Sequence, residues 1–363
     1  MVRAILHVDM DAFYVSVERR EDSNLVGKLV VVGANPKGGK GRGVVMACSY
    51  EARERGIRSG MPVSIAWRKA PDAVYLRPNY DLYGSVSENV MNVLRGFADV
   101  LEHVSIDEAF LDISSKVSGY DGVVEYARLV KAAVREGEGL ACTIGAAPNK
   151  STAKIASDLA KPDGIKLVRP EEVGDFLAPL PVTRISGVGP KTAAVLEHAG
   201  IRTIGDLARF PGAELKRLLG KNAVWLWGIA RGLEQLPVEE RPDPKSISVE
   251  RTFERDVSEW FVVLETLDDI ARNVHLRARA QGATFRTAGI KIRFEGFRTH
   301  LRERSLGSHI LDEDALKKVA RDLIREFEAP GRKVRLLGVR VANLERPKAK
   351  QPTLAAFGVR DDT

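Results

Sequence analysis

The sequence predicts an α+β protein made of two or three domains. Its 363 residues exceed the length of about 150 residues that is typical of one domain. Over the first 166 residues, short apolar runs alternate with stretches of helical spacing, which is typical of a domain that mixes strands and helices. Residues 170–233 are helical in pattern, and residues 239–244 (EERPDP) follow with two prolines and no apolar face, as a linker does. A second set of helices and strands follows this linker.

Within the first 166 residues, bounded apolar runs predict buried strands, and apolar residues three and four apart predict helices. The strands are expected at residues 4–8, ending at Asp9, and at 28–32, 43–47 and 140–146, with a further pair or hairpin at 99–113. The helices are expected at residues 50–56, 89–97, 123–136 and 149–160. Pro162 and the turn that contains it end the last of these helices.

The segment after the linker is expected to form a small α+β module. Helical spacing is strong at residues 260–280 and recurs at 314–327. Residues 289–294 and 334–341 alternate between apolar and polar side chains, as half-exposed strands do. The residues from 346 onward are expected to form a flexible tail.

Composition excludes several classes of protein. An apolar fraction of 44% and a charged fraction of 29% are ordinary for a globular chain, so a disordered or fibrous protein is excluded. The apolar runs are too short to span a bilayer, so no membrane association is expected. The two cysteines, Cys48 and Cys142, form no CxxC pair, which argues against a disulfide framework and against a structural zinc site. We expect a cytoplasmic monomer.

The basic excess of the chain is confined to its C-terminal part. The formal net charge is +7, and residues 245–350 alone carry 23 Lys and Arg against 16 Asp and Glu. A module that binds a polyanion would have this charge, and so would a solvated basic surface. Composition leaves these two interpretations open.

Acidic residues gather at two points where apolar runs end or pair. Asp9 and Asp11 follow the first apolar run, and Asp107 and Glu108 stand inside an otherwise apolar strand pair. Carboxylates in a buried strand are costly unless a positive charge offsets them, and Mg²⁺ prefers such oxygens. Two such ions, a few ångströms apart, would activate an attacking oxygen and stabilise a leaving oxygen, as phosphoryl transfer requires. The alternative is that Asp9 and Asp11 cap a helix and that Asp107 and Glu108 form a hairpin turn. For the first pair taken alone, the helix cap is the better interpretation.

The two acidic segments together resemble a known family. Residues 9–14 (DMDAFY) and 105–110 (SIDEAF) are similar to the paired metal motifs of the Y-family DNA polymerases, in particular the DinB branch of DNA polymerase IV and its archaeal counterparts. The resemblance covers roughly residues 1–345. It implies a right-hand polymerase with a ferredoxin-like palm, small fingers, a helix–hairpin–helix thumb and a C-terminal α+β little finger. The implied segments are palm 1–19 and 77–166, fingers 20–76, thumb 167–232, linker 233–244, little finger 245–345 and a flexible tail at 346–363.

The resemblance also implies the metal ligands and the reaction. Asp9, Asp107 and Glu108 would be the catalytic carboxylates that bind two Mg²⁺ ions, with Mn²⁺ as a substitute, and the main-chain carbonyl of Met10 would be a further ligand. Asp11 belongs to the motif but is no principal ligand in the family. The implied reaction is the template-directed attack of a primer 3′-hydroxyl on the α-phosphate of a dNTP, with release of pyrophosphate.

Four further residues are candidates for the nucleotide pocket. Tyr50 and Arg53 lie three residues apart on one helical face, and the guanidinium of an Arg suits phosphate. Lys161 follows a helix end. The resemblance implies that these three hold the triphosphate and that Tyr14 is the steric gate that selects dNTPs over rNTPs. One departure is Ala47, which stands where the family commonly has a Thr that contacts phosphate.

Two segments are candidates for contacts with primer–template DNA. The sequence ISGVGPKTA is typical of a helix–hairpin–helix, in which Gly187 and Gly189 form the turn and Lys191 adds a cation near a phosphate. A plain tight turn between helices is the alternative. Lys291 and Arg293 share one face of a strand, which suits phosphate contacts of a little finger. A charged edge strand in solvent is the alternative.

The length of the chain bears on fidelity. The fingers segment is short, and no span remains for a separate proofreading exonuclease, so low-fidelity, translesion synthesis is expected. In the tail, Gln351, Leu354 and Phe357 resemble the peptide that binds the PCNA sliding clamp, although Gly358 replaces its second aromatic residue. A disordered terminus is the alternative.

Two other functions also fit parts of this pattern. A nucleotidyl cyclase can carry two acids on a similar palm, but it needs neither a helix–hairpin–helix nor a basic C-terminal module. A non-catalytic DNA-binding protein could use the same modules without the acids.

Overall fold

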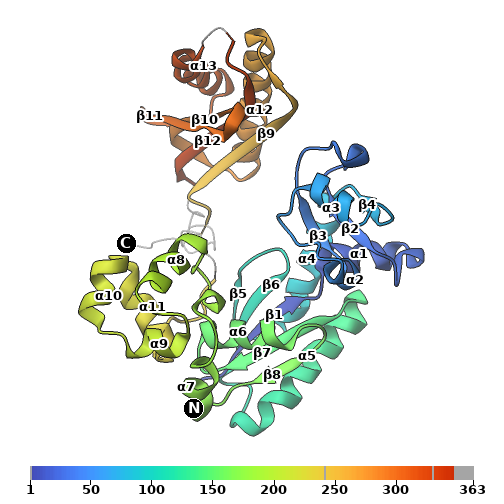
Figure 1. Ribbon diagram of the computed structural model, residues 1–363, viewed down its shortest axis with the longest axis vertical. Coiled ribbons are helices and arrows are strands. Elements are labelled where there is room, and N and C mark those ends of the chain that lie inside the picture. Colours follow the sequence, from blue (N-terminus) through green and yellow to red (C-terminus); the bar gives the residue numbers. More distant parts are fainter. Residues whose placement is uncertain (1, 241–242, 329–330, 347–363) are drawn as a thin grey trace, which may run out of the picture. The chain divides into compact units, whose positions relative to one another are not determined.

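The computed structural model describes residues 2–240, 243–328 and 331–346 of the chain (Figure 1). It consists of two compact units, Met1–Arg241 and Pro242–Thr363. Each unit combines a sheet with helices, so the expected α+β class is confirmed. The two units are described separately below.

The centre of the first unit is a five-stranded sheet of order β5-β6-β1-β7-β8. Its strands are β1 (Ile5–Met10), β5 (Val100–His103), β6 (Glu108–Asp112), β7 (Cys142–Ala147) and β8 (Ile165–Leu167). The middle strand, β1, is buried along its whole length and pairs antiparallel with β6 and β7. The sheet therefore places its first strand between two strands that lie about a hundred residues or more away along the chain.

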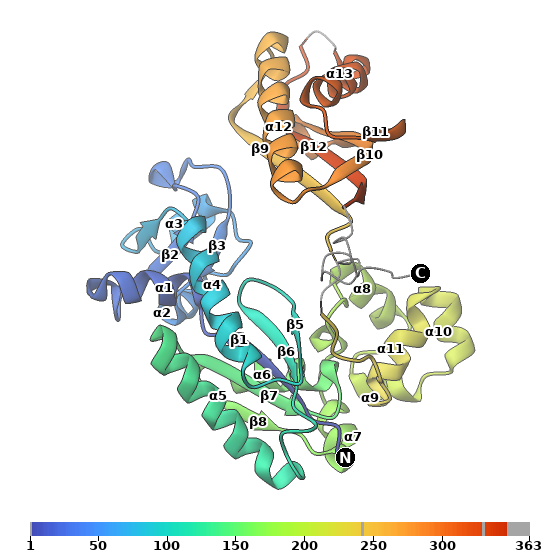
Figure 2. The same cartoon turned by 180° about the vertical axis from the view of Figure 1, so that it is seen from behind.

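Helices cover both faces of this sheet (Figure 2). They are α4 (Tyr80–Arg95), α5 (Val123–Glu138) and α6 (Lys150–Ala160). Alternation along β1 divides its side chains: Leu6 and Val8 join the core with α4 and α5, whereas Ile5 joins the core with α6. Asp9 lies four residues after Ile5 in the same strand, so its side chain points to the same face of the sheet, the face that α6 covers.

A three-stranded sheet of order β3-β2-β4 forms a smaller part of the first unit. Its strands are β2 (Val30–Gly33), β3 (Val45–Cys48) and β4 (Val74–Leu76), and the neighbouring helices are α1 (Phe13–Glu21), α2 (Tyr50–Glu54) and α3 (Val63–Lys69). The hydroxyl of Ser49 accepts a hydrogen bond from the Ala52 N–H at 3.3 Å and so caps the start of α2. This cap fixes where the candidate residues Tyr50 and Arg53 begin their helix.

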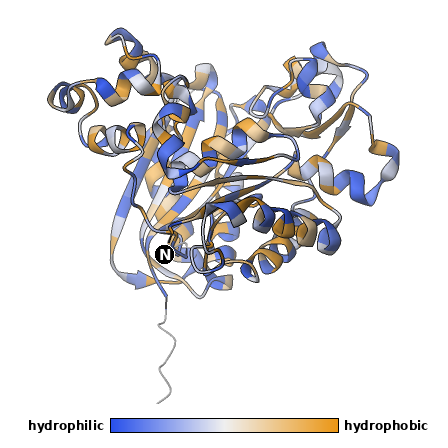
Figure 3. Ribbon diagram, turned by 90° about the horizontal axis from the view of Figure 1, so that it is seen from below, coloured by the Kyte–Doolittle hydropathy of each residue, from blue (hydrophilic) through white to orange (hydrophobic). Residues whose placement is uncertain are grey.

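The expected helical stretch follows the five-stranded sheet. It consists of α7 (Val173–Leu177), α8 (Pro190–His198), α9 (Ile204–Arg209), α10 (Gly212–Leu219) and α11 (Asn222–Ala230). These helices share a core with Ile5, Phe110 and Ile155 of the sheet domain, so they pack firmly on it. Helices throughout the molecule carry both hydrophobic and hydrophilic residues (Figure 3), as amphipathic helices do.

The second unit is a four-stranded sheet with two helices on one face. The sheet has the order β11-β10-β12-β9. Its elements are β9 (Ser246–Val257), α12 (Trp260–Ala280), β10 (Thr284–Phe294), β11 (Thr299–Ile310), α13 (Glu313–Ile324) and β12 (Val334–Glu345). Ile290 and Ile292 share a core with the helices. Lys291 and Arg293 therefore point to the opposite, open face of β10.

The structure differs from the sequence-based expectations at several boundaries. β1 does not end at Asp9, because Asp9 still pairs with Glu108 and with Thr143. Helix α4 begins at Tyr80, earlier than expected. Strands β9 and β11 were not expected, because both are charged and largely exposed along their length.

The segment expected as a linker, 233–244, is largely attached to the first unit. Val238 is 5% exposed and belongs to the core of the helical part. The Arg3 guanidinium donates to the main-chain oxygens of Glu234 and Leu236, and the Glu102 carboxylate accepts from the Glu239 N–H. The residues of this segment before 241 thus have specific contacts with the first unit, although Leu233 and Leu236 remain exposed.

Candidate active site

One cavity of about 320 Å³ gathers the candidate metal and nucleotide residues. Its wall includes all eight of them, although they come from segments as far apart as residues 9 and 161. The pairing of β1 with β6 explains part of this convergence, because it sets Asp9 opposite Glu108 and joins the Met10 N–H to the Asp107 carbonyl at 2.9 Å. The remaining residues arrive from α1, α2 and the loop after α6.

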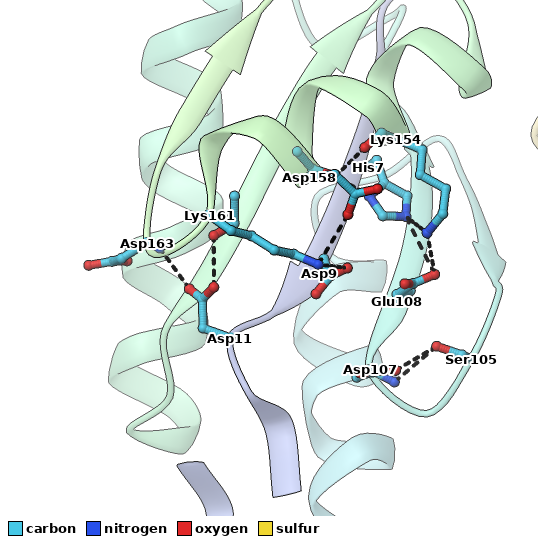
Figure 4. A network of polar contacts seen from close by, with 12 residues as sticks. His7, Asp9, Asp11, Ser105, Asp107, Glu108, Lys154, Asp158, Lys161 and Asp163 are labelled. Atoms are coloured by element: carbon cyan, nitrogen blue, oxygen red, sulfur yellow. Dashed lines mark hydrogen bonds and ion pairs between the residues drawn. The ribbon is translucent and has the colours of Figure 1, made fainter. Parts of the chain in front are cut away.

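Asp9 is the most deeply buried carboxylate of the cavity wall, at 3% exposure. Lys161 Nζ lies 2.7 Å from its Oδ2 and also 3.2 Å from Asp158 Oδ1 (Figure 4). Burial raises the pKa of Asp9 to about 7, and the Lys161 ammonium acts against this rise. The side chain expected to face a triphosphate is thus the one that pairs with Asp9.

Glu108 is held by a lysine that the sequence analysis did not single out. Lys154 Nζ, on α6, lies 2.7 Å from Glu108 Oε2, and the ring of His7 lies 3.7 Å from the same oxygen. Burial alone would raise the pKa of Glu108, but the hydrogen bond with His7 and the Lys154 ammonium together outweigh burial and lower that pKa. His7 is fully buried, and burial lowers its pKa; its Nδ1 contacts Ser157 Oγ at 2.7 Å.

Asp107 has a local partner. The Ser105 hydroxyl, to which the sequence analysis gave no role, donates to Asp107 Oδ1 at 2.6 Å. Figure 4 shows this pair below Glu108, with Asp9 on the neighbouring strand and Lys161 beyond it, at the end of α6. Asp107 is only partly buried, so its carboxylate has access to the cavity.

The donor set fits a hard divalent cation. Three carboxylates and the carbonyl-bearing Met10 face one cavity, and oxygen atoms of this kind are the ligands that Mg²⁺ prefers. In the parts of the chain that the structure describes, no three Asp, Glu, His or Cys side chains are already gathered as a metal site. Lys154 and Lys161 instead neutralise Glu108 and Asp9, as a bound cation would.

Tyr50 and Arg53 lie together on one face of α2, as expected. The Arg53 guanidinium stacks over the Tyr50 ring at 4.5 Å from its centroid. The Tyr50 hydroxyl donates to Asp11 Oδ1 at 2.9 Å. Burial, and then the Asp11 carboxylate, raise the pKa of Tyr50, so its hydroxyl keeps its proton. Ala47 also lines the cavity, which confirms that the departure from the family's Thr falls on its wall.

Tyr14 is held in place by a second tyrosine. Its ring stacks on that of Tyr83 with centroids 4.4 Å apart and planes inclined by 17°. The Tyr83 hydroxyl in turn donates to Glu18 Oε1 at 2.5 Å. Tyr83 is fully buried, so Tyr14 rests on a fixed surface rather than on a mobile side chain.

None of the candidate DNA contacts is part of the wall of this cavity. Gly187 has φ +90° and a Cβ there would meet the Trp225 ring at 3.1 Å, so both its conformation and its space require glycine. Gly189 caps α8, in which Lys191 is exposed. Lys291 and Arg293 lie on the open face of β10, as described above. The clamp-peptide residues Gln351, Leu354 and Phe357 lie outside the described residues.

Lys291 and Arg293 already have partners within the sheet. Lys291 Nζ pairs with Glu250 at 2.9 Å, and Arg293 Nε donates to the Thr299 hydroxyl at 2.8 Å. Both side chains are only partly buried, so they remain accessible to a ligand.

Three families of known sequences match successive parts of the chain. Residues 8–158 match the impB/mucB/samB family, residues 244–354 match the C-terminal domain of that family, and residues 180–233 match the helix–hairpin–helix motif of DNA polymerase eta and Rev1.

Among the described residues, no helix combines the length and the apolar character that a membrane span needs.

Curated relatives match over nearly the whole length. DNA polymerase IV of Methanoculleus marisnigri is 46% identical over 98% of both chains. DNA polymerase IV 2 of Methanosarcina mazei is 43% identical over 98% of this chain and 96% of its own.

Solved structures agree with these relatives. A chimera of the Y-family DNA polymerases Dbh and Dpo4 has a TM-score of 0.86 at 30% identity and covers 94% of this chain and 99% of its own. DinB from Sulfolobus solfataricus has a TM-score of 0.63 at 31% identity with the same coverage. The family models, the curated relatives and the solved structures thus agree over nearly the whole chain, and the chain belongs to the Y-family of DNA polymerases, in the branch of DNA polymerase IV.

Proposed function

We propose that this low-fidelity, DNA-directed DNA polymerase joins dNTPs to a primer 3′-hydroxyl in the cavity walled by Asp9, Asp107 and Glu108. The observation that carries the proposal is the convergence of all eight candidate residues on that one wall. Membership of the family implies dependence on a divalent metal. Asp9, Asp107, Glu108 and the Met10 carbonyl would hold two Mg²⁺ ions, with Mn²⁺ as a substitute. When bound, these ions activate the attacking oxygen and stabilise the leaving one.

The other side chains of the cavity bind and select the nucleotide. Arg53 and Lys161 supply a guanidinium and an ammonium to the triphosphate. Tyr50 borders the triphosphate and positions the Arg53 guanidinium by stacking, while its hydroxyl donates to Asp11. Lys161 pairs with Asp9, and it would be free to turn to the phosphates once a bound cation neutralised that carboxylate. Tyr14, resting on Tyr83, excludes the 2′-hydroxyl of a ribonucleotide by overlap.

The remaining modules hold primer–template DNA by its phosphates. One structural neighbour is the insertion ternary complex of Dbh DNA polymerase, which supports a DNA and nucleotide complex here too. Gly187, Gly189 and Lys191 would contact the duplex from the thumb, 167–232, and Lys291 and Arg293 from the little finger, 245–345. The palm would comprise residues 1–19 and 77–166, and the fingers residues 20–76.

The cellular setting is also part of the proposal. The chain acts as a cytoplasmic monomer, carries no proofreading exonuclease and copies damaged templates. Its tail, at Gln351, Leu354 and Phe357, docks on a PCNA-like sliding clamp.

Primer extension tests the assignment of the acids. Asp107→Ala should abolish extension with Mg²⁺ while the affinity for primed duplex stays near that of the unmodified chain. Asp112→Ala is the matched control, because Asp112 lies at the other end of β6 and its side chain bonds only Ser114 among the described contacts. Extension by Asp107→Ala, or a product formed from dNTP without primer, would contradict the proposal; the second result would indicate a nucleotidyl cyclase.

A further inference from the structure

We propose that Asp11 is a positioning residue that fixes Tyr50 and the loop of Lys161 relative to each other. The two candidate triphosphate contacts come from different parts of the first unit, and one buried carboxylate joins them. This inference rests on the proposed function, because it concerns how the triphosphate is held.

Asp11 occupies the junction of three segments. Its Oδ1 accepts hydrogen bonds from the hydroxyls of Tyr50 and Thr143, each at 2.9 Å, and its Oδ2 accepts from the Asp163 N–H at 2.9 Å. Figure 4 shows Asp11 below Lys161, joined to Asp163. The side chain is 5% exposed and is not part of the cavity wall. Asp11 thus touches the residues that hold the nucleotide rather than the nucleotide itself.

The loop after α6 needs such support. Asp163 has φ +52°, a left-handed conformation that is unfavourable for a residue with a side chain. The Asp163 carboxylate is held from outside by Lys131 at 2.7 Å and Arg135 at 2.9 Å, both on α5. Asp11 holds the same residue from inside, through its main chain. Lys161 lies two residues earlier, so its position over Asp9 depends on both anchors.

The junction depends on the two oxygens of the Asp11 side chain. Three donors converge on them, and a carboxylate accepts hydrogen bonds through both oxygens. An asparagine could keep these contacts, because its carbonyl can accept from the Asp163 N–H while its NH₂ group donates to the Tyr50 and Thr143 hydroxyls. Asp11→Ala removes both oxygens and therefore breaks both sides of the link.

Single-nucleotide insertion kinetics test this inference. Asp11→Ala should raise the KM for dNTP about tenfold and change kcat by less than about threefold, because the phosphate contacts shift while the acids stay in place. The Mg²⁺ concentration for half-maximal activity should not change. In the Asp11→Ala background, Tyr50→Phe should raise KM by less than it does alone, since the two residues act through one contact. Asp112→Ala, which removes a carboxylate of β6 bonded to Ser114, is the matched control for general effects on the sheet.

The outcomes separate this inference from the proposed function. If the unmodified chain is active and Asp11→Ala leaves the KM for dNTP unchanged, the inference alone is overturned. KM effects that multiply in the double variant overturn it as well. A changed Mg²⁺ requirement would mean that Asp11 is a metal ligand, which also overturns it. If Asp11→Ala fails to fold, Thr143→Val removes one donor without altering the cavity wall; a smaller rise in KM at unchanged kcat supports the link, and no rise refutes it. An inactive unmodified chain refutes the proposed function and this inference with it.

Discussion

Gly145→Ala should separate helix α6 from the sheet that it covers. Gly145 lies in β7, and a Cβ built there would be 2.0 Å from the Ala153 carbonyl oxygen and 2.3 Å from the Ser157 nitrogen. Both contacts are main-chain atoms of α6, which cannot turn aside as a flexible side chain does. Because Cβ atoms do not approach other atoms closer than 3.0 Å, the helix must retreat by about 1 Å.

That displacement reaches the candidate active site. Helix α6 carries Lys154 and Ser157 and leads to Lys161, and their contacts with Glu108, His7 and Asp9 are each 2.7 Å long. A shift of about 1 Å lengthens them beyond the limit of a hydrogen bond. Overpacking costs about 1–3 kcal/mol, and each of the three lost contacts adds roughly 1 kcal/mol. We therefore expect the free energy of unfolding of the first unit to fall by about 4–6 kcal/mol and most of the polymerase activity to disappear.

Urea unfolding of the full chain and primer extension measure both effects. Gly84→Ala is the matched control, because Gly84 lies in the interior of α4 with open space around its Cβ position. This variant should be more stable than the unmodified chain by up to about 1 kcal/mol, since alanine is the better helix former. If Gly145→Ala unfolds at the same urea concentration as Gly84→Ala and extends primers normally, the close packing of α6 on β7 is wrong.

Three further perturbations give distinct readouts. Tyr83→Leu removes the ring on which Tyr14 rests, so the ratio of kcat/KM for CTP to that for dCTP should rise by about two- to tenfold, and Tyr83→Phe should leave it unchanged. Hydrogen bonds from Thr203 lower the pKa of Asp206 to about 2. The ionised Asp206 carboxylate therefore stabilises the fold above pH about 4, and this stabilisation is lost as the pH falls toward 2. The thermal unfolding temperature of Asp206→Asn should depend less on pH across that window than that of the unmodified chain, and an equal dependence would contradict the prediction. Lys291→Ala should weaken duplex binding and reduce the slope of log affinity against log salt by about one, whereas an unchanged slope would remove Lys291 from the interface.

Periodic patterns predicted the long elements well. The spacing at residues 260–280 matches α12 at both ends, because one apolar face packs on a sheet along the whole helix. The patterns failed for β9 and β11, whose side chains are mostly exposed and charged. Such strands are specified by pairing with β12 and β10, and pairing between distant segments leaves no periodic signal in either of them.

The candidate site divides in the same way. Residues inside recognisable motifs, such as Asp9 and Tyr50, could be found because the motif itself marks them. Lys154 and Tyr83 could not, since a lysine on a helix and a buried tyrosine are common and only the fold brings them to Glu108 and Tyr14. Asp11 was visible in its motif, but its partners Thr143 and Asp163 lie over 130 residues away.

The central place of β1 determines which side of the cavity opens first. Amide groups of β1 are bonded to strands on both sides, so hydrogen exchange there requires disruption of the whole sheet. Asp9 lies in that strand, whereas Tyr50 and Arg53 lie in α2, a helix of five residues beside a three-stranded sheet. On warming, the part of the cavity wall that contains Tyr50 and Arg53 should therefore unfold locally before the part that contains Asp9. The chain would then lose discrimination among nucleotides before it loses the capacity for chemistry.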